Sequence, residues 1–350
     1  MAETSYHKEE ARKNALKLRE LTENLPSYVR DFFRGIESVT ESRTRIAYAY
    51  DLTVFFRYLH ENNYYFSKKE IKEIKLRDLE ELRPTDIEEF LDYVKVYSSE
   101  ESPETRTNEL STIKRKLAAL RSFYKFFYMR EMIKYNPVEL VAMPKLHEKN
   151  IIRLDPDEVS ELLDHVENGE RLTKTQLAFH KKTKVRDLAI MTLLLGTGIR
   201  VSECVGLNLN DVDFKNHGIM IHRKGGKEVT VYFGDEVEGA LLQYMAERKQ
   251  IFPADGHENA FFLSSQKKRM CVRSVENMVK KYTETVTLTK HITPHKLRST
   301  YGTNLYRETG DIYLVADVLG HSDVNTTKKH YAAIEDERRR QARDKVKLRK

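Results

Sequence analysis

The chain is organised around the stretch TPHKLRSTYGTNLYRETGDIYLVADVLGHSDVNTTKKHY, residues 293–331. Its first two residues, Thr and Pro, suit the N-cap and the first position of a helix, so the stretch predicts a helix that begins there. His295 and Arg298 are three residues apart and would share one face of its first turn. Since a helix N-terminus favours anions, a phosphate fits there. His321 and Tyr331 follow on a segment that can fold back to the same place.

A second cation comes from the run GTGIR at residues 196–200. It ends an apolar stretch, 185–196, that predicts a buried helix, and it places Arg200 at the start of another helix. The run is not a dinucleotide-binding fingerprint, because it follows a helix and lacks a third glycine. Glu203, one turn further, either holds an active-site cation in place or is an acid that the helix dipole favours.

A β-hairpin is predicted over residues 218–233, where two β-rich runs flank Gly225-Gly226. Two glycines between such runs predict a tight two-residue primed turn. Lys224 and Lys227 stand on either side of it, so either lysine is a candidate for the tip of the hairpin.

These residues suit phosphoryl transfer. The two guanidiniums, Arg200 and Arg298, can clamp the non-bridging oxygens of a phosphodiester and neutralise the charge of a pentavalent transition state. Tyr331 can attack once His295 has taken its proton, because the pKa of a free tyrosine is about 10. Lys224, or its competitor Lys227, can protonate the departing 5′ oxygen.

The remaining histidine, His321, can donate a hydrogen bond to the phosphoryl oxygens. This chemistry needs no metal and no cofactor. His291 and His295 have the spacing of a zinc pair, but Pro294 starts the helix after His291 and no carboxylate stands at ligand spacing. We therefore expect no metal site.

Composition bounds the class of protein. The 350 residues are enough for two domains, and no run approaches the ~18 apolar residues of a membrane span, so no membrane partner is expected. The N-terminus has no apolar signal region, and the 2 cysteines are far apart, which fits a cytoplasmic protein without disulfides.

Positive charge gathers on a predicted helix over residues 110–130, part of a segment, 105–130, with seven cations and one acid. Such clustering is typical of a polyanion binder, and a solvated helix face explains it equally well. A second helix, over 42–60, carries two arginines in its first turn, where the dipole disfavours cations unless an outside anion is present. The candidate DNA-binding residues are therefore Arg43, Arg45, Lys114, Arg115, Arg121 and Lys227.

The apolar periods predict a mainly α protein with a small antiparallel β-sheet. Helices are expected over 7–24, 42–60, from Pro84, 110–130, from Asp155, 185–196, 235–249 and 272–286, with a polar break over 98–109. On the 42–60 helix, the predicted inward stripe is Ile46, Tyr50, Val54 and Tyr58. We place the domains at 1–145 and 153–350, with a linker over 146–152.

The combination of motifs resembles the tyrosine recombinase (phage-integrase-like) family, and within it the Xer type. The resemblance lies in the boxes around Arg200, Lys224, His295 with Arg298, and His321, and it extends over roughly residues 25–335. It implies an N-terminal helical, SAM-like core-binding domain and an α+β catalytic domain. Many members place the nucleophile nine residues after the second histidine. That position is His330 here, and Tyr331 follows it.

The resemblance also implies partners and a reaction. It implies duplex DNA with a dif-like recombination site, a homotetramer on two DNA sites with a C-terminal docking segment, and an FtsK-type DNA translocase as an activator. Cleavage would give a 3′-phosphotyrosine, and ligation would proceed through a Holliday junction, as in chromosome dimer resolution. The alternatives are a phage or transposon integrase, a type IB topoisomerase, and a non-catalytic DNA-binding protein.

Overall fold

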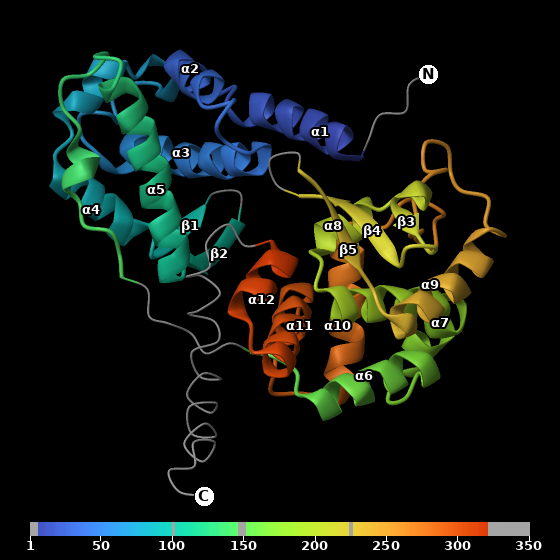
Figure 1. The fold of residues 1–350 in the computed structure, drawn as a ribbon. Coiled ribbons are helices and arrows are strands. Elements are labelled where there is room, and N and C mark those ends of the chain that lie inside the picture. The colour runs from blue at the N-terminus through green and yellow to red at the C-terminus, as the bar shows by residue number, and fades with distance from the viewer. Residues whose placement is uncertain (1–5, 100–101, 146–151, 224–226, 321–350) are drawn as a thin grey trace, which may run out of the picture. The chain divides into compact units, whose positions relative to one another are not determined.

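The structure is a computed structural model that describes residues 6–99, 102–145, 152–223 and 227–320. The chain forms two compact units, Met1–Glu148 and Lys149–Lys350 (Figure 1). The predicted linker, 146–152, lies outside the described residues except for Ile152. None of the described helices is long and apolar enough to cross a membrane.

The first unit is helical. Its helices are α1 (Tyr6–Leu21), α2 (Ser27–Gly35), α3 (Ser42–Asn62), α4 (Pro84–Tyr93) and α5 (Leu110–Tyr128), with 3-10 turns η1 (Ile71–Glu73), η2 (Leu76–Glu81) and η3 (Pro137–Leu140). Edge-to-face aromatic pairs fill the core between α2, α3 and α5; Phe123 contacts both Phe32 and Phe56 in this way. Such pairs add to the stability that burial of the rings provides.

One prediction for the first unit was wrong and another was correct only in part. The polar break over 98–109 contains two antiparallel strands, β1 (Val96–Ser99) and β2 (Ser102–Thr107). Main-chain hydrogen bonds pair these strands although the segment lacks the apolar pattern that would have predicted them. On α3, Tyr58 is buried as predicted, but the buried stripe also includes Leu52, Phe55 and Leu59, while Tyr50 is exposed. Leucine and phenylalanine carry no polar atom in the side chain, whereas tyrosine carries a hydroxyl, so the fully apolar side chains face the core.

Helix α5 also differs from expectation. Its cations were expected to face either a polyanion or solvent, yet the Lys116 side chain is buried and its Nζ lies 3.1 Å from Asp51 Oδ1. Arg115 donates to Asp51 Oδ2. A buried carboxylate on α3 thus binds two of the cations, since a buried charge is stable only when it is paired.

The second unit is mainly helical with one small sheet. Its elements are α6 (Pro156–Asn168), α7 (Lys174–Thr197), α8 (Val201–Gly206), η4 (Leu209–Asp211), β3 (Val212–Asp213), β4 (Gly218–His222), β5 (Glu228–Tyr232), α9 (Asp235–Arg248), α10 (Val272–Val286), α11 (Pro294–Thr309) and α12 (Ile312–Leu319). The sheet is antiparallel with strand order β3-β4-β5. The predicted fold class, mainly α with a small antiparallel sheet, is confirmed.

The register of the hairpin corrects the predicted turn. His222 pairs with Glu228, and the Arg223 amide donates to the Lys227 carbonyl at 2.8 Å. A two-residue turn at Gly225-Gly226 would instead have paired residue 224 with Lys227. The observed register keeps Ile219 and Val231 together on the buried face, and a shift by one residue would turn one strand over.

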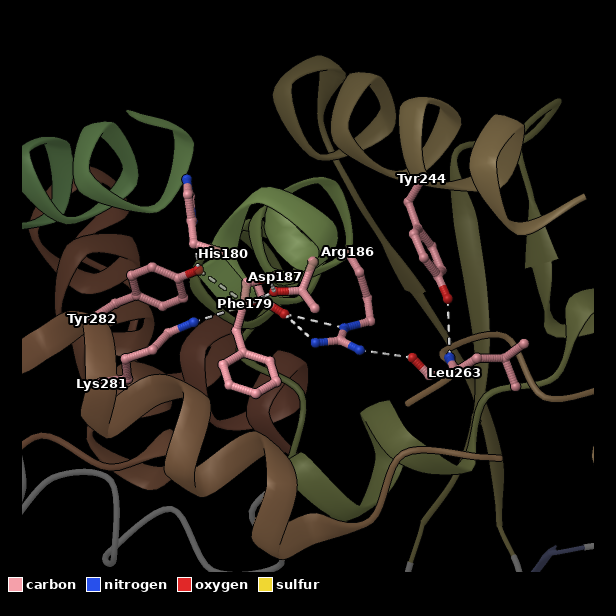
Figure 2. Close-up of polar contacts among 9 residues, drawn as sticks. Phe179, His180, Arg186, Asp187, Tyr244, Leu263, Lys281 and Tyr282 are labelled. Atoms are coloured by element: carbon pink, nitrogen blue, oxygen red, sulfur yellow. Dashed lines mark hydrogen bonds and ion pairs between the residues drawn. The ribbon is translucent and has the colours of Figure 1, made fainter. Parts of the chain in front are cut away.

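Helix α7 is longer than the apolar run 185–196 indicated, and a buried carboxylate anchors it (Figure 2). Asp187 Oδ1 accepts from Arg186, whose Nη2 lies 2.6 Å away. Its Oδ2 accepts from Thr183, Lys281 and Tyr282 at 2.9, 3.2 and 3.0 Å. Because the last two residues come from α10, the carboxylate joins α7 to α10.

Candidate active site

Arg298 is the residue that joins three of the predicted motifs. Its guanidinium is buried, Nη1 donates to the Gly198 carbonyl at 2.6 Å, and Nη2 donates to the Leu319 carbonyl. Gly198 belongs to the run that delivers Arg200, and Leu319 directly precedes Gly320-His321 in the sequence. Helix α11 therefore lies between the end of α7 and the end of α12, and its arginine binds both.

Arg200 stands at the N-cap of α8, as the glycines before it predict. Gly198 ends α7 in the left-handed region at φ 62°, which a glycine adopts without strain. Glu203 is buried and accepts from the Arg200 amide at 2.7 Å and from its Nη1 at 2.8 Å. Both expected roles of this acid are combined, because it caps the helix and holds the guanidinium of Arg200, whose side chain stays 40% exposed.

His295 lies in the first turn of α11, which begins at Pro294 as predicted. Its side chain is exposed, whereas Arg298, one turn later, is buried. The two residues thus lie at different depths near the same helix terminus. Thr293 occupies the N-cap but its side chain makes no capping hydrogen bond.

The structure adds an arginine that the sequence did not single out. Arg223, the residue that follows β4, donates through Nη2 to the Val318 carbonyl at 2.6 Å and through Nη1 to the Asp317 carbonyl at 3.3 Å. Burial lowers the pKa of Arg223, Glu203 raises it and Arg200 lowers it, so Arg223 shares the field of that pair. The one sequence feature that could have pointed to Arg223 is its position directly before Lys224.

Three predicted residues lie outside the described part of the chain: Lys224, His321 and Tyr331. The competitor of the first, Lys227, is described and is exposed directly before β5. The structure thus brings the motifs of Arg200, Arg298 and the end of α12 together, and it leaves the choice between the two lysines open.

The candidate DNA-binding residues of the first unit mostly have partners within it. Arg45 Nη1 donates to Glu37 at 2.7 Å, and Arg43 lies 3.7 Å from Glu10. Arg121 Nη2 donates to the Val141 carbonyl at 2.6 Å, and Arg115 binds Asp51. These contacts supply the counter-groups that a first-turn or clustered cation needs. Lys114 is half-buried.

Within the described ranges, no group of three or more His, Cys, Asp or Glu side chains gathers in a way that would hold a metal ion.

Comparison with protein families gives two matches along the chain. The family described as "Phage integrase family" matches residues 152–338. The family described as "Phage integrase, N-terminal SAM-like domain" matches residues 29–131. Among curated proteins, the tyrosine recombinase XerS of Streptococcus pyogenes serotype M5 is 32% identical over 347 residues, covering 90% of this chain and 94% of that protein.

Solved structures share the fold. The XerH site-specific recombinase bound to difH substrate, in its pre-cleavage complex, has a TM-score of 0.59 at 22% identity and covers 82% of this chain and 74% of its own. The Tn1549 transposon integrase in complex with circular intermediate DNA has a TM-score of 0.62 at 20% identity, with 87% and 95% covered. A lambda integrase dimer bound to a core site has a TM-score of 0.58 at 15% identity, with 86% and 96% covered.

The predicted recognition and the two-part recombinase fold are thereby confirmed. Since the matches reach both units and a curated relative shares 32% of its residues over nine-tenths of the chain, this protein belongs to the phage integrase family and is a site-specific tyrosine recombinase.

Proposed function

We propose that the protein cleaves and rejoins duplex DNA through a covalent bond to Tyr331. The tyrosine oxygen attacks the phosphorus of one phosphodiester, the bond to the 5′ oxygen breaks, and a 3′-phosphotyrosine and a free 5′-hydroxyl result. A 5′-hydroxyl of a partner strand then reverses the attack, through a Holliday junction. The observation that carries this proposal is the Arg298 guanidinium, which binds the backbones of two other motifs at one place.

The two arginines supply the positive charge. A guanidinium has five N–H donors. Arg298 directs two nitrogens at backbone carbonyls, which orients its plane, and Arg200 is oriented through one nitrogen by the buried Glu203. Donors that are fixed before the reaction cost no reorganisation when charge develops on the phosphoryl oxygens. Arg200, being partly exposed, is placed to reach a phosphate from solvent.

The other groups move protons. We assign His295 as the base that takes the tyrosine proton, Lys224 as the acid that protonates the 5′ oxygen, and His321 as a hydrogen-bond donor to the phosphoryl group. The exposure of His295 supports its part, because a base must reach an incoming substrate. Lys227 remains the alternative acid.

We infer that the substrate is a dif-like site on the chromosome and that four copies act on two such sites. The XerS relatives, similar over most of the chain, favour chromosome dimer resolution over integration of a mobile element. An FtsK-type translocase and a docking C-terminal segment belong to the same proposal, as do a cytoplasmic location and the domain limits 1–145 and 153–350. The candidate cations of the first unit, together with Lys227, would bind the DNA backbone; they are Arg43, Arg45, Lys114, Arg115 and Arg121.

A nicked suicide duplex tests the reaction. The short fragment beyond the cleavage point diffuses away, so the covalent adduct accumulates and its modified residue is mapped by mass spectrometry. We expect the adduct on Tyr331, and we expect Tyr331→Phe to abolish it while duplex binding is kept. An adduct on another residue, or one that persists in the variant, contradicts the proposal. Relaxation of supercoiled DNA by a monomer without strand exchange would favour a topoisomerase instead.

A further inference from the structure

We propose that Arg223 is a positioning residue of this site: it ties the end of β4 to the end of α12 and thereby orients the general acid that follows it in the chain. The inference rests on the proposed function, in which Lys224 protonates the departing 5′ oxygen. Arg223 itself transfers no proton in this proposal. Its role is mechanical, and it acts through its neighbour.

The guanidinium of Arg223 donates hydrogen bonds to the carbonyls at the C-terminal end of α12. The last carbonyls of a helix have no partner inside it and carry partial negative charge, so a guanidinium there is favoured. Arg223 takes the carbonyls of Asp317 and Val318, and Arg298 takes the next one, Leu319. Two arginines from different elements therefore hold the last three residues of α12.

The contact between Arg223 and α12 depends on a glycine at position 320. It ends α12 in the left-handed region at φ 61°, and a Cβ at this position would overlap the guanidinium of Arg223. A glycine is needed there for two independent reasons, since a larger residue would be strained and would displace the arginine. The close approach of side chain and backbone indicates a fixed joint between the hairpin and the helix.

The backbone of Arg223 is held as well as its side chain. Its amide donates to the Lys227 carbonyl at 2.8 Å, the last described hydrogen bond of the hairpin before residues 224–226. Its Nε is buried and has no hydrogen-bond partner among the described residues, so the guanidinium is oriented by its two Nη atoms. Arg223 is thus held through both its amide and its guanidinium, in the field of the Arg200–Glu203 pair, and Lys224 is the next residue in the sequence.

A substrate with a sulfur leaving group separates positioning of the acid from every other role. In a bridging 5′-phosphorothiolate duplex the bond that breaks is P–S, and a thiol, with a pKa of about 8.5, leaves without protonation. The duplex carries the sequence at which the wild-type protein forms its adduct. Single-turnover cleavage is measured on this substrate and on the ordinary oxygen duplex, with wild type, Arg223→Gln, Lys224→Ala and Arg171→Gln.

We expect Lys224→Ala and Arg223→Gln both to be slow on the oxygen duplex and to cleave the sulfur duplex at the wild-type rate. The loss for Arg223→Gln should reach about a hundredfold, the effect of misplacing a reacting group by about 1 Å. Arg171→Gln is the matched control, because Arg171 also donates to a backbone carbonyl of the same unit, that of Thr285, but is exposed and pairs with Glu161, which is no residue of the site. It should match wild type on both substrates.

An equal loss for Arg223→Gln on both duplexes, or no loss on either, overturns the inference. If Lys224→Ala is rescued by sulfur and Arg223→Gln is not, this inference fails while the proposed acid stands. If Lys224→Ala is not rescued, the proposed acid fails and the inference fails with it. Full activity on sulfur also shows that the variant is folded. Should Arg223→Gln not fold, Arg223→Lys keeps the charge but cannot span both carbonyls, and we expect a smaller loss with the same rescue.

Discussion

Replacing Asp187 by asparagine should strongly destabilise the second unit while leaving the first unit unchanged. The carboxylate is 1% exposed and accepts five hydrogen bonds from described residues, two from Arg186 and three from Thr183, Lys281 and Tyr282. The substitution Asp187→Asn keeps the size of the side chain. It also turns an amide N–H₂ toward donors and leaves two cations without a counter-charge.

The magnitude follows from that arrangement. Removing one partner of a buried ion pair costs about 3–5 kcal/mol, because the remaining charge stays buried. The Arg186 and Lys281 side chains are 14% and 19% exposed, so they can recover only part of their hydration. For a unit of this size the loss corresponds to a fall in Tm of roughly 6–20 °C.

The assay combines urea unfolding, followed by circular dichroism, with hydrogen exchange read by mass spectrometry. We expect faster exchange in α7 and α10, which the carboxylate joins, and unchanged exchange in α3 and α5. Glu284→Gln is the matched control: this acid also lies on α10, but its pair with Lys280 is exposed on both sides and should contribute little. If Asp187→Asn unfolds within about 1 kcal/mol of wild type, the reasoning about the buried charge is wrong.

Three further predictions follow from particular residues. Burial lowers the pKa of His180, so the unfolded chain takes up this proton first; stability should fall as pH drops below about 6.5, and His180→Gln should flatten that dependence in urea midpoints measured between pH 5 and 7.5. Gly198→Ala meets both a left-handed backbone and the Tyr301 ring, so it should cost about 1–3 kcal/mol of unfolding free energy and slow adduct formation. Deleting the residues after Asp336 should impair synaptic assembly and recombination, measured by gel shift and junction formation, far more than half-site binding; unchanged recombination would remove the docking role of this segment.

The sequence alone determined the local structure where a few residues dominate the backbone. Pro156 after Asp155, Pro294 after Thr293 and Gly198 before Arg200 each restrict the chain within one turn, and the helices begin or end where they predict. The fold class and the family were predicted from such residues at helix ends and from motifs in a fixed order. Both depend on residues that are close in sequence.

Only the tertiary structure decided which side chains meet. The charge pattern of α5 predicted cations that face a polyanion or solvent, but Asp51 on α3 binds Arg115 and Lys116. In the sequence, Arg223 belonged to a predicted strand. Only the structure shows that α12 lies close enough for the Arg223 guanidinium to donate to its Val318 carbonyl. The register of the hairpin likewise depended on which face the core covers. Hydrophobic periodicity and helix capping involve residues a few positions apart, so the sequence shows them. Ion pairs and hydrogen bonds to carbonyls join residues of different elements, and the sequence pattern does not show which elements come together.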